Sequence, residues 1–250
     1  MTRIKQCAEL IRAGRTPGQI QKQLGPPQDT ISGYLDRAVG EGFITRSEIL
    51  LNIVDEVTSA GLDPLDPDFT KLPRDDHEIS RNVLIADFLY FRARDGANTL
   101  RSELLPTISS LEASLHYLVA RVLSAHFNSS EDSWWDQGVP EPIRRACSRR
   151  REDDDDPAHP YAYTLFSNLY SIIEQRWDQF REHLPPAASG DKANLISTLR
   201  RINAIRNRLV HPTRTFMPGR ADFELAISCR DGLAPGAWRF DGTPAQSLPA

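Results

Sequence analysis

A helical repeat of apolar residues in the second half of the chain constrains its fold more than any other feature. Residues 104–123, 161–181 and 192–211 place apolar side chains three or four positions apart. That spacing puts them on one face of an α-helix. A shorter stretch, residues 79–91, has the same period, and Pro106 either starts or kinks the helix in which it lies. The pattern predicts a mainly α chain with a four-helix bundle.

Composition excludes several classes of protein. A chain of 250 residues can bury a sizeable core without a disulfide or metal staple. The three cysteines are widely separated and lack C-x-x-C spacing, which argues against a disulfide framework and a zinc site. The amino terminus is charged and the apolar runs are interrupted, so neither a signal peptide nor a membrane span is predicted. We expect a cytoplasmic protein that uses no metal or cofactor.

Residues 1–47 are predicted to form an amino-terminal domain of three short helices. Thr16-Pro17 supplies a helix cap followed by proline, and Gly25-Pro26-Pro27 forces a turn. Gly42-Phe43-Ile44 then begins an extended segment. This order of helices followed by a short wing resembles the winged helix-turn-helix family of DNA-binding domains.

The resemblance implies that the third helix enters the major groove of DNA. The residues that would then lie beside bases or phosphates are Gln28, Thr30, Ser32, Gly33 and Arg37. Seven basic and four acidic side chains give residues 1–47 a weak positive charge, whereas the whole chain carries −4. Use of this domain for protein contacts alone is an equally open alternative.

Residues 48–78 are acidic and contain several prolines, so the domain boundary is placed there. Within them a short helix is predicted from Ile49 to Ala60, followed by a linker. The helical domain covers residues 79–215. Residues 216–250 form an irregular tail in which Phe223 to Cys229 is a possible strand.

Residues 128–160 interrupt the helical pattern. They contain Trp134-Trp135, a short predicted helix after Pro140, and five arginines that run into five acidic residues. A solvated loop is one interpretation. In the other, arginines such as Arg149 and Arg150 contact a polyanion while the tryptophans pack or stack on bases.

The strongest concentration of polar chemistry is Arg206-Asn207-Arg208-Leu209-Val210-His211, followed by Pro212. Asn207 and His211 share one helix face, and Arg206 is rotated by about 100° from Asn207. Because proline disfavours a helical residue before it, His211 is predicted at or just past the helix end. A guanidinium beside an imidazole suits a phosphate. A simple capping histidine is the alternative.

The string RNRLVH, preceded by Leu199, Ile202 and Ile205, resembles the RNxxxH motif of the HEPN superfamily of helical endoribonucleases and nucleotide-binding domains. With Trp134-Trp135 and LYSIIEQRWDQF, the resemblance extends over about residues 85–215. It is similar to the carboxyl-terminal HEPN domain of a eukaryotic nuclear RNA-surveillance endoribonuclease and to its bacterial relatives.

This resemblance implies a metal-independent endoribonuclease that acts as a homodimer through its last helix. The catalytic residues would be Arg206, Asn207 and His211, and the RNA 2′-hydroxyl would attack the adjacent phosphate. RNA-binding residues would be Arg201, Arg208 and Arg214 with Arg149 and Arg150. Family analogy suggests a toxin, antiphage or stress role.

Two alternatives stay open. One is a DNA-binding regulator without catalysis, whose bundle dimerises or binds a nucleotide. The other alternative concerns the general base of a catalytic reaction. Glu112 and Glu174 are candidates for it, although the sequence supplies no geometry for either.

Overall fold

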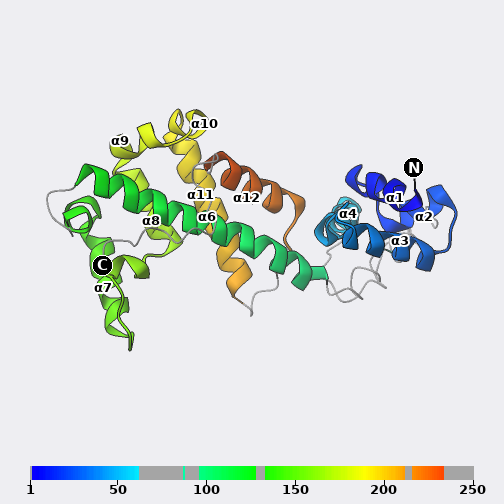
Figure 1. Ribbon diagram of the computed structural model, residues 1–250, viewed down its shortest axis with the longest axis horizontal. Coiled ribbons are helices and arrows are strands. Elements are labelled where there is room, and N and C mark those ends of the chain that lie inside the picture. Colours follow the sequence, from blue (N-terminus) through cyan, green and yellow to red (C-terminus); the bar gives the residue numbers. More distant parts are fainter. Residues whose placement is uncertain (1, 62–86, 88–95, 128–132, 212–215, 234–250) are drawn as a thin grey trace. The chain divides into compact units, whose positions relative to one another are not determined.

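The computed structural model describes residues 2–61, 87, 96–127, 133–211 and 216–233 (Figure 1). Every regular element within these residues is a helix, which confirms the predicted mainly α fold. The chain divides into two compact units, Met1–Leu104 with His211–Phe223 and Leu105–Val210 with Glu224–Ala250. No helix in the described part has the length and apolar composition that a membrane span requires.

The first unit begins with the three helices expected before residue 47. The helices of this region are α1 (Arg3–Arg12), α2 (Pro17–Leu24), α3 (Gln28–Gly40) and α4 (Arg46–Ser59). Threonine side chains at residues 2, 16 and 45 cap three of them by accepting a backbone N–H. The helix predicted from Ile49 to Ala60 corresponds to α4. It starts earlier because Thr45 and Glu48 form a capping box.

The core of this unit lies between α1 and the helices that contact it, α2, α3 and α4. Ile11, Ile20, Ile31 and Leu35 are each at most 1% exposed. Gly25 ends α2 with φ of 86°, a left-handed conformation that favours glycine, and the chain then turns into α3. The predicted turn therefore forms where the sequence places it.

The predicted wing does not form. Residues 41–45 make a turn rather than a strand, and α4 follows directly. The physical reason is the capping box at Thr45, which starts a new helix before an extended segment can develop.

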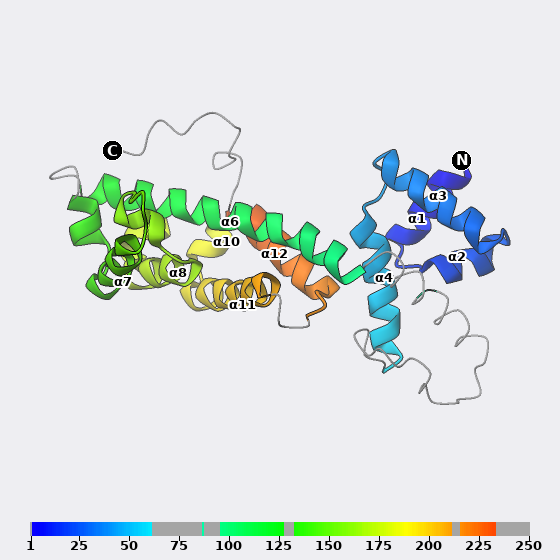
Figure 2. The ribbon, with the colours of Figure 1, turned by 90° about the horizontal axis from the view of Figure 1, so that it is seen from below.

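The second unit is built on α6 (Gly96–His126), whose first residues belong to the first unit. The other long helices are α7 (Glu141–Glu152), α8 (Phe166–Gln175), α11 (Lys192–Val210) and α12 (Arg220–Leu233). The short elements are η2 (Trp134–Gly138), η3 (Pro160–Tyr163), α9 (Trp177–Phe180), η4 (Arg181–His183) and α10 (Pro186–Ser189). Figure 2 shows α7, α8 and α11 on the same side of α6.

Buried apolar stripes hold this unit together. On α6 the stripe is Leu104, Ile108, Leu111, Leu115, Val119, Val122 and Leu123, each at most 1% exposed. Contacts between α8 and α11 bury Leu169, Ile172, Leu199 and Ile202. Pro106 lies inside α6, so it does not start the helix.

The helix predicted from Tyr161 to Arg181 is divided into η3, α8 and α9. Arg176 separates α8 from α9, with φ of −108° and ψ of 28°. Its guanidinium donates to the carbonyl oxygens of Gly138 at 2.9 Å and Gln137 at 2.6 Å. These long-range bonds connect the helix break to the end of η2.

The predicted strand from Phe223 to Cys229 is wrong, because these residues lie in α12. The buried side chains Phe223, Ala226, Cys229 and Leu233 recur every three or four residues, which is a helical period. The two units divide after Leu104, Val210 and Phe223, and the domain boundary placed within residues 48–78 stays a prediction. The helix predicted over residues 79–91 lies outside the described residues except for Asp87.

All three cysteines are free and buried. Burial raises the pKa of the Cys7 and Cys147 thiols and raises that of Cys229 to about 12. These thiols act as small apolar core residues.

Candidate functional site

The polar motif occupies the end of α11, whose orientation is fixed by its buried face. Leu199, Ile202, Ile205 and Leu209 are at most 5% exposed. The helix starts at a cap in which Asn194 N donates to Asp191 Oδ1 at 2.9 Å, as one of the two predicted caps requires. These buried residues fix which face of α11 points into the core, and the polar residues of the motif lie at the edge of that face or on the solvent side.

Arg206 lies at the edge of the buried face, where it pairs with a residue far away in sequence. Its Nε donates to Glu112 Oε2 of α6 at 3.2 Å. The two side chains are 28% and 18% exposed, so the pair is largely withdrawn from water. Within the described chain, no residue binds the two Nη groups of Arg206. Glu112 thus holds one edge of the guanidinium and leaves the other edge for a ligand.

Asn207 is half-buried and His211 is exposed. The last residue of α11 is Val210, so His211 lies just past the helix end, as the following proline predicted. Neither side chain forms a hydrogen bond with any part of the chain that the structure describes. Convergence of all three motif side chains stays a prediction.

Three arginines near the motif are predicted to bind RNA, and the structure describes two of them. Arg201 and Arg208 are exposed residues of α11. Arg214 lies outside the described residues.

A second ion pair forms on α11, six positions before Arg206. Arg200 Nη2 donates to both carboxylate oxygens of Glu174 on α8, at 2.9 and 3.2 Å. This pair is 56% and 37% exposed, and Arg200 also lies over the Tyr170 ring at 5.9 Å. Of the two glutamates weighed as bases, Glu112 lies with the motif residue Arg206 and Glu174 does not.

His116 lies one turn after Glu112 on α6, and no partner was predicted for it. Burial lowers the pKa of its imidazole, while the Glu112 charge raises it. Its Nδ1 is 3.3 Å from Thr164 Oγ1, and its backbone oxygen accepts from the Tyr161 hydroxyl at 2.6 Å. Glu112 and His116 are four positions apart on a predicted helix, and this spacing could have indicated from the sequence that they interact.

Trp134 and Trp135 do not stack on a ligand, because each is only 6% exposed. Trp134 packs parallel to His159 with centroids 5.8 Å apart and edge-on to Tyr161 at 5.1 Å. Of the two roles weighed for these aromatics, packing within the protein is the one that the structure has. Their large apolar area is buried beneath α7 and η3 instead.

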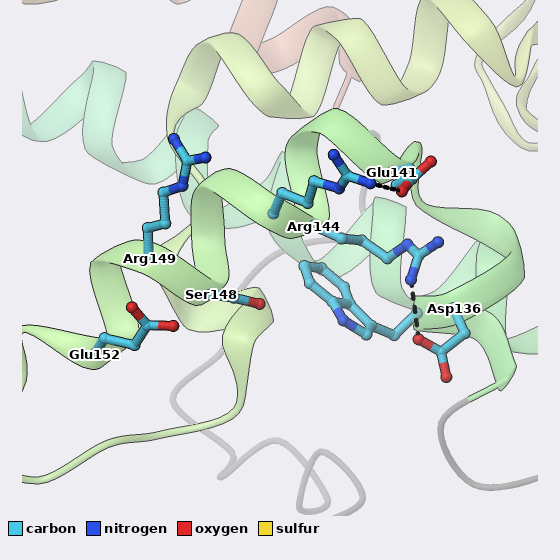
Figure 3. Close-up of a pocket in the computed structure, with 8 residues that line it drawn as sticks. Asp136, Glu141, Arg144, Ser148, Arg149 and Glu152 are labelled. Carbon is cyan, nitrogen blue, oxygen red and sulfur yellow. Dashed lines mark hydrogen bonds and ion pairs between the residues drawn. The ribbon is translucent and has the colours of Figure 1, made fainter.

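The arginine cluster is helical, since it lies on α7. An open hollow of 490 Å³ beside α7 is lined by three arginines and three acidic residues (Figure 3). Two of the arginines are already paired there, Arg144 with Asp136 at 3.2 Å and Arg145 with Glu141 at 2.5 Å. The hollow is therefore electrically balanced, which does not favour a polyanion.

The two arginines of α7 predicted to bind RNA have different surroundings. Arg150 is half-buried and donates to the Tyr163 carbonyl at 2.9 Å, so it fastens η3 to α7. Arg149 is exposed and has no partner in the described part of the chain.

On α3, Gln28, Thr30 and Ser32 are half-buried. Gly33 and Arg37 are exposed, and Arg37 lies 3.7 Å from Glu41 in an exposed pair. This pair leaves the Arg37 side chain accessible, because solvent-exposed ion pairs are weak.

No protein-family model matches the chain, and comparisons with curated proteins and with solved structures give no match. The described residues also contain no group of three or more histidine, cysteine or carboxylate side chains placed to hold a metal ion. The arguments for function therefore depend on the residues of this chain.

Proposed function

We propose that the chain is a metal-independent endoribonuclease in which Arg206, Asn207 and His211 bind and cleave the RNA backbone. The observation that carries this proposal is the pairing of Arg206 with Glu112. Glu112 binds Nε and so fixes the direction of the guanidinium, while both Nη groups stay without a partner among the described residues. A guanidinium held in this way suits two oxygens of one phosphate.

The proposed reaction uses the hydroxyl that distinguishes RNA from DNA. The 2′-oxygen forms a new bond to the adjacent phosphorus, and the bond from phosphorus to the 5′-oxygen of the next nucleotide breaks. The products are a cyclic phosphate end and a 5′-hydroxyl end. His211 transfers a proton at one of these oxygens, and Arg206 offsets the negative charge that grows on the phosphate. Asn207 orients the phosphate through its amide.

We propose further that the site is shared by two copies of the chain that pair through α11. Val210, within the motif, is an apolar residue with 41% exposure that a second copy would cover. Arg201 and Arg208 on the exposed side of α11 would extend the positive surface along the RNA.

The test is cleavage of a single-stranded RNA in buffer that contains EDTA. We expect Arg206→Ala and His211→Ala each to reduce the rate constant by about 100-fold to 10,000-fold. Arg200→Ala is the matched control, since Arg200 is a paired arginine of the same helix, and its rate should stay within about twofold of wild type.

A substrate with a single 2′-deoxy nucleotide at the cleaved position tests the chemistry. It should stay intact because the attacking hydroxyl is missing. Equal cleavage by wild type, Arg206→Ala and His211→Ala would show that the proposed site is wrong.

The amino-terminal helices support a second candidate, a DNA-binding regulator. The favourable observation is that α1, α2 and α3 pack together and that α2 and α3 are joined by a tight turn at Gly25. Binding to a library of duplex DNA, compared between wild type and Arg37→Ala, tests this candidate. Sequence-specific duplex binding without any RNA cleavage would favour the regulator over the nuclease.

A further inference from the structure

The first unit includes a short stretch from the far end of the chain. Residues 216–223 belong to this unit, although α1 to α4 lie at the amino-terminal end. Phe216 and Phe223 are only 9% and 8% exposed, and Arg220, the first residue of α12, lies between them in sequence. A stretch this distant in sequence needs specific contacts to stay in place, because ordering each residue costs conformational entropy.

Arg220 supplies such contacts through two of its nitrogen atoms. Its Nε donates to Asp55 Oδ2 at 2.6 Å, and its Nη2 donates to Asn52 Oδ1, also at 2.6 Å. Both acceptors belong to α4 and precede Arg220 by 165 and 168 positions. Because they are three positions apart on one helix, they share a face, and a single guanidinium reaches both.

Asn52 has a second set of contacts that does not involve Arg220. Its Nδ2 donates to the carbonyl oxygen of Ile11 at 2.7 Å and to that of Arg15 at 2.9 Å. These two oxygens lie at the end of α1 and in the connection to α2. Asn52 therefore holds α4 on α1 and on the connection to α2 by bonds of its own.

The two halves of this network differ in burial. Asn52 is only 3% exposed, whereas the Arg220 and Asp55 side chains are 38% and 42% exposed. Water and salt weaken an exposed ion pair, and they reach a buried amide far less. The contacts of Arg220 are therefore the weaker half of the network.

We propose that residues 216–223 form a strap that Arg220 closes on α4, and that the strap opens and closes while α1 and α4 stay packed. Opening moves the Arg220 guanidinium into water and uncovers Phe216 and Phe223. It leaves the two bonds from Asn52 to carbonyl oxygens intact. The strap is thus a salt-sensitive conformational device of the first unit, and it does not depend on the proposed RNA chemistry.

The helices that support the regulator candidate do not depend on the strap. Both α2 and α3 contact α1, and Asn52 holds the end of α1. Opening of the strap therefore leaves the arrangement of α1, α2 and α3 unchanged. Ionic strength acts on the strap rather than on these helices.

Backbone amides within the strap can report its opening. Gly219 N donates to Asp222 Oδ2 at 2.9 Å, and Phe223 N donates to the Gly219 oxygen at 3.3 Å. These bonds form the start of α12, and the first turn of a helix frays when nothing holds it. Hydrogen exchange at these amides therefore measures how often the strap leaves α4.

The first experiment is hydrogen exchange of the full chain, followed by mass spectrometry of peptides from the strap, α1 and α4. Arg220→Ala should raise the exchange rate in the strap about tenfold, because hydrogen bonds from a charged group are lost. Rates in α1 and α4 should stay within about twofold of wild type. Arg230→Ala is the matched control, since Arg230 lies on the same helix and pairs with its neighbour Asp231, and it should change none of the three.

Two outcomes of the first experiment overturn the proposal. Unchanged exchange in the strap of Arg220→Ala would mean that Arg220 does not hold it. Equal acceleration in the strap, α1 and α4 would mean that the unit opens as a whole.

The second experiment raises NaCl from about 0.1 to 1 M at constant pH. We expect exchange in the wild-type strap to rise about twofold to fivefold as the exposed pair is screened, and exchange in α1 to stay constant. Asp55→Asn keeps an acceptor but removes the charge, so its strap should exchange faster at low salt and respond little to NaCl. A wild-type strap that ignores NaCl, or a salt response that Asp55→Asn retains in full, overturns the proposal.

The third experiment removes the buried half of the network. Asn52→Ala should accelerate exchange both in the strap and at the end of α1, because it loses the bonds to Arg220 and to the carbonyl oxygens. Acceleration in the strap alone would contradict the separate role of Asn52. Should this variant fail to fold, the first two experiments still decide the question.

Discussion

Two arginines of α11 each form an ion pair with a glutamate of another helix, and the two pairs differ in their exposure to water. Arg200 and Glu174 make the shorter contact, 2.9 Å, but they are 56% and 37% exposed. Arg206 and Glu112 are 3.2 Å apart, yet they are 28% and 18% exposed. Water screens the first pair and screens the second less. Distance alone therefore does not rank these pairs, and the withdrawn pair is the one that fixes a side chain of the proposed site.

The largest expected difference between the pairs is in RNA cleavage. Arg206→Lys keeps the charge but loses the planar fork that binds Glu112 and a phosphate together, so we expect the rate constant to fall about 100-fold. Arg200→Lys should change it less than about twofold. Rates of RNA cleavage by the two variants measure this difference. Equal rates would mean that the geometry of Arg206 has no part in the reaction.

The next difference is in stability. Glu112→Ala leaves the Arg206 guanidinium half-buried without its partner, so we expect a loss of about 1–2 kcal/mol in the free energy of unfolding. Glu174→Ala should cost about 0.5 kcal/mol because its partner is already in water. Urea unfolding followed by tryptophan fluorescence reports on this unit, which contains Trp134, Trp135 and Trp177. A larger loss for Glu174→Ala would reverse the comparison.

The salt dependence of the coupling energy should also differ between the two ion pairs, by a smaller amount. Double-mutant cycles give the coupling energy of each pair. Raising NaCl from about 0.1 to 1 M shortens the screening length from about 10 to 3 Å. We expect the Arg200–Glu174 coupling to fall below about 0.3 kcal/mol, whereas the Arg206–Glu112 coupling should keep at least about half its value because both groups are mostly covered. Parallel losses would contradict this ranking.

The smallest expected effect is on His116, which lies one turn after Glu112. The Glu112 charge raises the pKa of this imidazole against the effect of burial, so Glu112→Gln should lower it further. Acidification below about pH 6.5 destabilises the folded unit, because the unfolded chain then binds the proton that buried His116 does not, and Glu112→Gln should deepen that loss. Proton NMR of the imidazole measures the pKa, with Glu174→Gln as the unchanged control.

The sequence alone predicted most features that depend on neighbouring residues. The apolar period of α11 and its cap at Asp191 are local patterns, and the structure has both. The position of His211 past the helix end followed from the proline after it. Similarly, the turn at Gly25 depends on the backbone freedom of one residue. Such features need no knowledge of the rest of the fold.

Features that depend on distant residues were missed. Glu112 and Arg206 are 94 positions apart, and only packing of α11 against α6 brings them together. Arg176 breaks a strongly periodic helix because carbonyl oxygens of η2 bind its guanidinium. The strand predicted from Phe223 to Cys229 shows a different failure, since a short apolar run fits both periods until its buried side chains are known.

Because all three thiols are buried, the reaction of each cysteine with a thiol reagent reports local opening of the helix that contains it. Cys7 lies in α1, Cys147 in α7 and Cys229 in α12, and each must leave the core before a thiol reagent can reach it. Mass spectrometry after brief alkylation would therefore measure how often each of these helices exposes its buried side, without any substitution in the chain. One experiment would therefore report local opening in both the amino-terminal helices and the bundle, through cysteines that the chain already contains.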